Sequence, residues 1–142
     1  MAARVIIADD NPVFRDVLKY ILMDSNMEII AETDNGMDTI EQAEKLEPDL
    51  LLLDISMPNL DGIEVLQALR KSHSDLKIII LTMHKGLSGQ VFKLGANGCC
   101  IKDCKPKKLL ECIEKVLSGK PLFALHKIIP AFRKISHFPM IF

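Results

Sequence analysis

The chain has 142 residues, of which 49% are hydrophobic and 26% are charged, and its formal net charge is -1 at pH 7. These values are typical of one globular domain with a sizeable core and argue against a disordered or fibrous chain. The near-neutral charge gives no indication of a nucleic-acid or membrane-surface binder. The longest apolar runs, at residues 50–53 and 78–81, are too short to span a bilayer, and residues 1–10 lack a long apolar signal segment. We therefore expect a cytoplasmic protein without a membrane partner.

The first expected unit of the chain is a strand followed by a helix. Residues 4–8 form a β-branched run that predicts a buried strand, and Asp9 and Asp10 stand at its end. Asn11 and Pro12 then supply a helix cap and a first-turn proline. The apolar residues at helical spacing, which we expect in the core, are Val13, Val17, Leu18, Ile21 and Leu22.

The next two units repeat this order. Residues 27–31 predict a second strand, and the helix that follows is closed by Pro48. Residues 50–53 are four consecutive leucines, a pattern typical of a central parallel strand covered on both faces. Asp54 ends this strand, and after a turn the chain restarts as a helix near Asp61. The apolar positions that mark these two helices are Ile40, Ala43, Leu46, Ile63, Leu66 and Leu69.

The pattern weakens after the fourth strand. Residues 77–81 predict this strand, which ends at Thr82. Because Gly86 and Gly89 interrupt the next segment, only residues 91–94 predict a helix, and we expect that helix to be short or irregular.

The last unit combines a short strand with the strongest amphipathic helix of the chain. Residues 99–101 predict the strand, and Lys102 stands at its end. Pro106 occupies a first helical turn, and Gly119 stops the helix.

The cysteines of the chain are Cys99, Cys100, Cys104 and Cys112. They contain no Cys-x-x-Cys pair and have no companion histidine pair at ligand spacing, so we expect no zinc site. We expect reduced, partly buried thiols, with Cys99 and Cys100 on opposite faces of their strand.

Strict alternation of strands and helices predicts an α/β domain with a parallel sheet and right-handed crossovers. The carboxyl ends of parallel strands share one edge of the sheet, where such folds bind ligands. The polar residues expected at this edge are Asp9, Asp10, Asp54, Thr82 and Lys102. Each has an ordinary explanation alone, as a cap, a turn or a solvated residue, but their joint occurrence indicates a functional site.

This constellation resembles the receiver domains of two-component response regulators. The matching segments are Asp9-Asp10, residues 54–62, Thr82 with the two residues before it, residues 95–98 and Lys102-Asp103. The resemblance covers residues 3–119. The sequence of the matching segments is most similar to the subgroup whose receivers precede a LuxR-type, helix-turn-helix DNA-binding module. It implies a flavodoxin-like, doubly wound five-stranded parallel sheet of order 2-1-3-4-5 with helices on both faces.

The resemblance also implies a chemistry for these residues. Asp54 would be the nucleophile that takes a phosphoryl group from a histidine of a sensor kinase. Mg²⁺ would be bound directly by Asp10, through water by Asp9, and by Asp54 and the main-chain carbonyl of Ser56. Lys102 would give a second positive contact to the phosphoryl oxygens. The protein would be a signalling switch with slow self-dephosphorylation at most, and no organic cofactor is expected.

A switch in this family needs a residue that reads the phosphoryl group. Thr82 would bind the phosphoryl oxygen through its hydroxyl and shift an equilibrium between two arrangements of the last strand-helix units. A homodimer would form through the fourth and fifth strand-helix units. Most relatives carry an aromatic residue at the position of Cys99, so we expect weaker coupling between phosphorylation and surface change here. Ser56 and His84 occupy positions whose residues, in this family, flank the path of the water that attacks the phosphoryl group. His84 is equally consistent with an exposed loop residue.

Two other functions remain open. A degenerate receiver would keep the fold as a docking module that binds partners without phosphorylation. A Mg²⁺-dependent aspartyl phosphatase would use Asp54 as its nucleophile, but Ser56 stands where that enzyme needs a second acid. A flavin-binding module is less consistent still, because the acidic edge would repel the flavin phosphate.

Residues 120–142 are not explained by the resemblance. This segment is basic and apolar, contains no acid, and is interrupted by Pro121, Pro130 and Pro139. It is too short for a DNA-binding domain, so we expect no nucleic-acid contact from this chain itself. A docking or dimerisation segment, a membrane-surface patch, and a disordered remnant of a lost output domain all remain open, and we favour the remnant.

Overall fold

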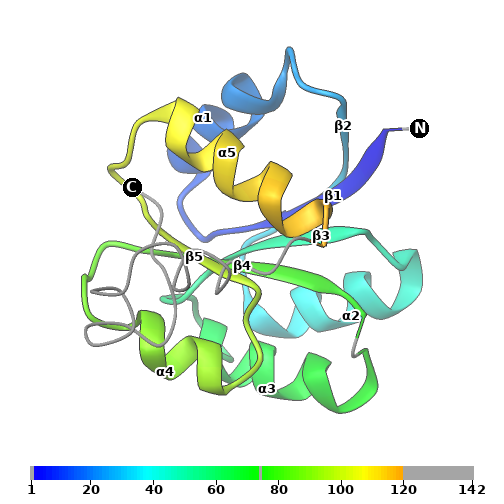
Figure 1. Cartoon of the computed structure of the whole chain (residues 1–142). Helices are drawn as coiled ribbons and strands as arrows, with labels where there is room; N and C mark the ends of the chain where they lie inside the picture. Colours follow the sequence, from blue (N-terminus) through cyan, green and yellow to red (C-terminus); the bar gives the residue numbers. More distant parts are fainter. Residues whose placement is uncertain (1, 74, 120–142) are drawn as a thin grey trace.

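The computed structural model describes residues 2–73 and 75–119, which form one five-stranded parallel sheet (Figure 1). The strands are β1 (Ala3–Ala8), β2 (Met27–Thr33), β3 (Leu50–Asp54), β4 (Lys77–Thr82) and β5 (Gly98–Ile101). The helices are α1 (Pro12–Leu22), α2 (Gly36–Leu46), α3 (Gly62–Ser72), α4 (Ser88–Lys93) and α5 (Pro106–Leu117). The strand order β2-β1-β3-β4-β5 confirms the expected doubly wound, flavodoxin-like fold.

The helices cover both faces of the sheet. In Figure 1, α1 and α5 lie on one face, and α2, α3 and α4 lie on the other. Strand β3 runs through the middle, and the side chains of residues 50–53 are fully buried. Burial on both faces explains why this strand is an unbroken run of leucines and not an alternating pattern.

Helix α1 begins as the sequence predicts but presents a different face to the core. The Asn11 side chain accepts hydrogen bonds from the amides of residues 13 and 14, and Pro12 opens the helix. Leu18 and Leu22 are buried, whereas Val13 and Val17 are 68% and 44% exposed. The expectation that both valines belong to the core was wrong, because Phe14 takes the inward position of the first turn.

The other element boundaries differ from the expected ones by up to three residues. Strand β2 continues to Thr33, whose hydroxyl lies 2.6 Å from the hydroxyl of Thr39 in α2. Helix α2 ends at Leu46, before Pro48, because Glu47 adopts a left-handed conformation with φ of 48°. Helix α4 begins at Ser88 and includes Gly89, so the glycine is tolerated inside this short helix.

Within residues 2–73 and 75–119, no helix is long and apolar enough to cross a membrane. The expectations for residues 120–142 lie outside the part of the chain that the structure describes.

Candidate functional site

Two adjacent strands deliver the acids of the site. Asp9 directly follows β1 and Asp54 ends β3, and these strands pair in parallel with Ala8 opposite Leu53. Asp9 and Asp54 are buried, whereas Asp10 is exposed. One carboxylate oxygen from each of these three aspartates lies within 4.8 Å of the other two. The structure thus brings together the three acids that the sequence places at this edge.

Lys102 completes the cluster from the end of β5. Its Nζ lies 2.7 Å from Oδ2 of Asp9 and 3.2 Å from Oδ1 of Asp54. The ammonium group also lies 4.7 Å from the centre of the Phe14 ring, over its face. A single cation therefore bridges two buried carboxylates, and an aromatic ring of α1 supports it.

Burial and charge together set the proton affinity of Asp54. Desolvation is the larger cause and the neighbouring Asp9 carboxylate the second, and they raise the pKa of Asp54 to about 6 although Lys102 and the Ser56 amide act in the opposite direction. Burial lowers the pKa of Lys102, but its contacts with Asp9 and Asp54 outweigh this and raise it overall. Lys102 is therefore charged, and Asp54 is mostly ionised at pH 7.

The β3–α3 turn holds Asp54 in place. The amide of Ser56 donates a 3.2 Å hydrogen bond to Oδ1 of Asp54, and Ser56 itself is exposed. The Gly62 amide donates a 2.8 Å hydrogen bond to the carbonyl of Ile55, which closes the turn. A Cβ atom on Gly62 would overlap the carbonyl oxygen of Asp54, so only glycine fits this close approach. Asp61 and Glu64 then begin α3 with a reciprocal capping box.

Thr82 lies one residue beyond Leu81, which pairs with Asp54 across the sheet. The Thr82 side chain is fully buried, and its hydroxyl oxygen accepts a 3.0 Å hydrogen bond from the His84 amide. The His84 side chain is exposed in the loop that follows. The main chain of the loop after β4 therefore fixes the position of the Thr82 hydroxyl, and the contact of His84 with that hydroxyl is made by its amide.

The donor set fits a hard divalent cation. Mg²⁺ prefers carboxylate, carbonyl and water oxygens. Oδ1 of Asp9 accepts a 2.9 Å hydrogen bond from the Asn11 amide, whereas the buried Oδ2 has no aligned hydrogen-bond donor among the described residues. Its 2.7 Å contact with Lys102 is thus an ion pair of poor hydrogen-bond geometry. A buried carboxylate oxygen with unused acceptor capacity, beside two further carboxylates, is suited to a cation.

Two residues of α1 contribute to the site but were missed from the sequence. Phe14 supports Lys102, and the Arg15 guanidinium donates a 2.7 Å hydrogen bond to the main-chain carbonyl of Asp9. Arg15 also donates a 3.1 Å hydrogen bond to Glu32 of β2. Their position in the first turn after Asn11 was the available signal, because that turn must face the same edge of the sheet as the acids.

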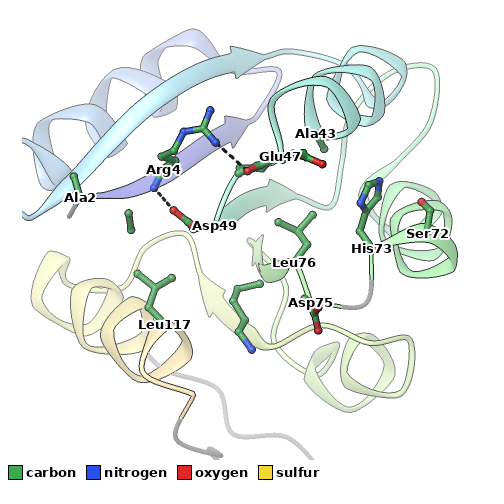
Figure 2. A pocket seen from close by; sticks show the side chains of 13 residues that line it. Ala2, Arg4, Ala43, Glu47, Asp49, Ser72, His73, Asp75, Leu76 and Leu117 are labelled. Carbon is green, nitrogen blue, oxygen red and sulfur yellow. Dashed lines mark hydrogen bonds between the residues drawn. The ribbon is translucent and has the colours of Figure 1, made fainter.

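A further pocket lies at the opposite edge of the sheet. Figure 2 shows this hollow of about 840 Å³, where the Arg4 amide donates a 2.8 Å hydrogen bond to Asp49 and the Arg4 guanidinium donates a 3.0 Å one to the Glu47 carbonyl. The Arg4 guanidinium also donates a 2.8 Å hydrogen bond to the Leu46 carbonyl, so it satisfies two carbonyl groups at the end of α2. The pocket is therefore separate from the acidic site and contains none of its residues.

Comparison with known proteins gives matches over most of the chain. The model of the response regulator receiver domain matches residues 5–114. The nitrate/nitrite response regulator NarL of Escherichia coli (strain K12) is 33% identical over 121 residues, which cover 83% of this chain and 56% of NarL. The chain thus spans less than two thirds of the length of that relative.

Solved structures give the same result. A LuxR-family two-component response regulator from Aurantimonas sp. SI85-9A1 superposes with a TM-score of 0.81 at 25% identity, over 94% of this chain and 99% of that chain. The receiver domain of RcsB from Salmonella enterica serovar Typhimurium, solved with the phosphomimetic BeF3-, gives a TM-score of 0.77 at 26% identity, over 86% and 93% of the two chains. With this fold and this acidic edge, the chain belongs to the family of response regulator receiver domains and is similar to LuxR-type members.

Proposed function

We propose that this protein is a phosphoacceptor receiver in which Asp54 takes a phosphoryl group from a histidine of a sensor kinase in a Mg²⁺-dependent reaction. The observation that carries this proposal is the placement of Asp54, whose carboxylate lies within 4.8 Å of those of Asp9 and Asp10 and 3.2 Å from the ammonium of Lys102. The RcsB receiver solved with BeF3-, a phosphomimetic, is consistent with the same chemistry in this fold.

Asp54 is suited to act as the nucleophile. Both described side-chain contacts of Asp54 fall on Oδ1, so we assign the attack on phosphorus to Oδ2. The new oxygen–phosphorus bond forms as the nitrogen–phosphorus bond of the phosphohistidine breaks, and the electron pair of that bond returns to the imidazole. A pKa of about 6 leaves Asp54 ionised near neutral pH without making it a poor nucleophile.

The charges around Asp54 decide whether it can accept a dianion. Asp9, Asp10, Asp54 and the carbonyl of Ser56 would hold Mg²⁺, which would withdraw charge from the transferring oxygens. Lys102 is already in contact with Asp54 and supplies the positive charge that the protein itself contributes. Phosphorylation adds acceptor oxygens beside Lys102, and the ammonium would exchange its Asp9 contact for a phosphoryl contact.

Helix α1 offers a docking surface for the kinase beside this site. Its exposed face carries Val13, Val17 and Tyr20, which are 68%, 44% and 75% exposed and lie at helical spacing on one stripe. The helix begins three residues after Asp9, so the stripe borders the acidic edge. An apolar face at that position suits a helix of the protein that carries the phosphohistidine.

The protein would act as a switch and not as an enzyme with a substrate of its own. A phosphatase would need a second acid where the exposed Ser56 stands. The degenerate-receiver alternative is less well supported, because Asp54, Lys102 and the three-carboxylate cluster are all in place. We also propose that the protein acts in the cytoplasm and forms a homodimer through the fourth and fifth strand-helix units. Its output would be the regulation of transcription. Similarity to the transcriptional regulatory protein DegU of Brevibacillus brevis supports that output.

The proposal is tested by intact-mass spectrometry after incubation with acetyl phosphate, with and without Mg²⁺. We expect one phosphoryl adduct that requires Mg²⁺ and is absent in Asp54→Asn. Asp75→Asn is the matched control, because Asp75 is an exposed carboxylate that lines the pocket at the opposite edge. The same adduct in Asp54→Asn would show that the nucleophile is misassigned, and no adduct in the wild type under any condition would favour the degenerate receiver.

A further inference from the structure

Three cysteines form a cluster at the junction of β5 and α5. Cys100 lies in β5, Cys104 in the turn after it, and Cys112 in α5. The thiols of Cys104 and Cys112 both interact with the thiol of Cys100. All three are free thiols; Cys100 and Cys112 are fully buried, whereas Cys104 is partly exposed. The cluster therefore has one thiol that solvent can reach and an adjacent one behind it.

The exposed thiol opens into a cationic pocket. A hollow of about 370 Å³ is lined by Lys85, Ile101, Asp103, Cys104, Lys105 and Lys108. Three lysines and one aspartate give this pocket a net positive character. A small molecule that carries carboxylates is the ligand that such a pocket favours, and Cys104 lies within its reach.

The same arrangement makes Cys104 a better nucleophile than an ordinary thiol. The hydrogen bond from Cys100 lowers the pKa of Cys104 to about 7, although burial and the charge of Asp103 act in the opposite direction. At pH 7 a larger fraction of Cys104 is thus thiolate than of an unperturbed thiol. The interactions with Cys104 and Cys112, followed by burial, raise the pKa of Cys100, so Cys100 holds its proton.

We propose that Cys104 is a redox modification site that attacks an anionic low-molecular-weight disulfide, with Cys100 as the resolving thiol. The thiols of this pair interact across one tight turn, so that turn need shift only far enough to bring the two sulfur atoms within bonding distance. That turn is held by a 3.0 Å hydrogen bond from the Cys104 amide to the Ile101 carbonyl.

The reaction has two exchange steps. The Cys104 thiolate bonds to one sulfur of the disulfide RSSR, and the other sulfur leaves as RS⁻. Cys100 then loses its proton, attacks the Cys104 sulfur and displaces the second RS⁻. Both RS⁻ groups take up protons, so the net change oxidises two protein thiols and reduces RSSR to two RSH. Once Cys104 is bonded to RS, its hydrogen bond with Cys100 is lost, and with it the leading cause that kept Cys100 protonated.

This disulfide would act on the phosphoacceptor site through Lys102. The bond would close a short loop over residues 100–104, and Lys102 lies at the centre of that loop. Because Lys102 contacts both Asp9 and Asp54, a change in the loop would alter the charge beside the nucleophile. This regulatory effect rests on the proposed function, whereas the thiol chemistry does not.

The test uses the reduced full chain and oxidised glutathione, followed by intact mass and peptide mapping. We expect the wild type to lose two thiols and form a Cys100–Cys104 disulfide, at a rate that rises with pH and is half-maximal near pH 7. The rate of thiol loss in Cys104→Ser should be at least about tenfold lower than in the wild type. Cys100→Ala should stop with one glutathione on Cys104. Cys99→Ala, which removes a buried thiol outside the cluster, should behave as the wild type.

Several results would overturn the proposal. A wild-type rate in Cys104→Ser, or a disulfide that maps to Cys99 or Cys112, would reject Cys104 as the attacking thiol. A lasting glutathione adduct on wild-type Cys104 would reject Cys100 as the resolving thiol. Uptake from acetyl phosphate is then compared between reduced and oxidised protein, and we expect oxidation to slow it in the wild type but not in Cys104→Ser. Absent uptake in the reduced protein would count against the proposed function alone, because the disulfide map does not depend on it.

Discussion

The main-chain amide of Lys102 donates a 2.8 Å hydrogen bond to the main-chain carbonyl of Thr82. This bond extends the ladder between β4 and β5, in which Thr82 pairs with Ile101. The side chains of the two residues have different roles in the proposed switch. The Lys102 ammonium would stabilise the phosphoryl group, whereas the Thr82 hydroxyl would respond to its presence. Their shared backbone bond means that a displacement of one strand end moves the other, so the two responses are mechanically linked.

Thr82→Val removes the hydroxyl while keeping the volume of the side chain. We expect phosphoryl uptake from acetyl phosphate within about twofold of the wild type, because the hydroxyl does not take part in bond formation. The change in the Lys102 amide resonance on phosphorylation should become much smaller, as followed by ¹⁵N NMR. Thr82→Ser restores the hydroxyl and should restore the shift. An unchanged resonance shift in Thr82→Val would mean that Thr82 does not read the phosphoryl group.

Lys102→Met removes the ammonium but keeps an apolar stem against Phe14. Asp9 and Asp54 then lose their shared cation, so we expect the free energy of unfolding at pH 7 to fall by about 3 kcal/mol. Because Lys102 lowers the pKa of Asp54, that pKa should rise above 6 in the variant. Calorimetric Mg²⁺ binding should persist while the phosphorylation response is impaired.

Lys108→Met is the control for this variant, since Lys108 is exposed and its ion pair with Glu111 is long, at 3.9 Å. Its stability should stay within about 0.5 kcal/mol of the wild type. If Lys102→Met lost Mg²⁺ binding while remaining folded, the ammonium would have a role in forming the cation site that the present contacts do not explain.

Asp54→Asn should stabilise the protein in metal-free buffer. The folded-state pKa of about 6 exceeds the ordinary value of 3.8, so between these pH values the folded protein binds a proton that the unfolded chain has released. Stability from this group therefore falls as pH rises from 4 to 6, and the penalty is complete above that range. The amide removes the penalty, which is about 2–3 kcal/mol at pH 7 and vanishes near pH 4. Urea unfolding of both proteins across this range measures the difference, and a difference that does not change with pH would contradict this prediction.

The sequence predicted the parts of this site that depend on the ends of strands. The leucine run of β3 and the β-branched run of β1 place Asp54 and Asp9 at one edge, because period and burial are local properties of the chain. The rotation of α1 is a tertiary property, so Val17 was assigned to the core and Phe14 was not assigned to Lys102. The thiol contacts of Cys100 depend likewise on how α5 packs against β5, which residue spacing does not report.

Val17→Asp tests the docking surface on α1. Val17 is 44% exposed and lies on the stripe with Val13 and Tyr20, so a carboxylate there should leave the fold intact. We expect uptake from acetyl phosphate to match the wild type, while transfer from a phosphohistidine protein slows by about tenfold or more, which corresponds to about 1.4 kcal/mol of lost docking energy. Met37→Asp, an exposed apolar position on α2, is the matched control and should leave both rates unchanged. Equal transfer rates in Val17→Asp and the wild type would place the kinase on another surface.

Gly62→Ala tests the close approach that supports the phosphoacceptor. The added Cβ would overlap the carbonyl oxygen of Asp54 and lie 2.6 Å from the Cα of Ile55, and both are backbone atoms that cannot rotate away. We expect the free energy of unfolding to fall by about 2–3 kcal/mol, because the end of β3 must shift to relieve the overlap. Gly89→Ala is the control, since Gly89 is helical and a Cβ there meets no described atom within 4 Å. It should raise stability by about 0.5–1 kcal/mol through helix propensity. Urea unfolding compares the two variants, and equal stabilities would contradict the tight packing of Gly62 against Asp54.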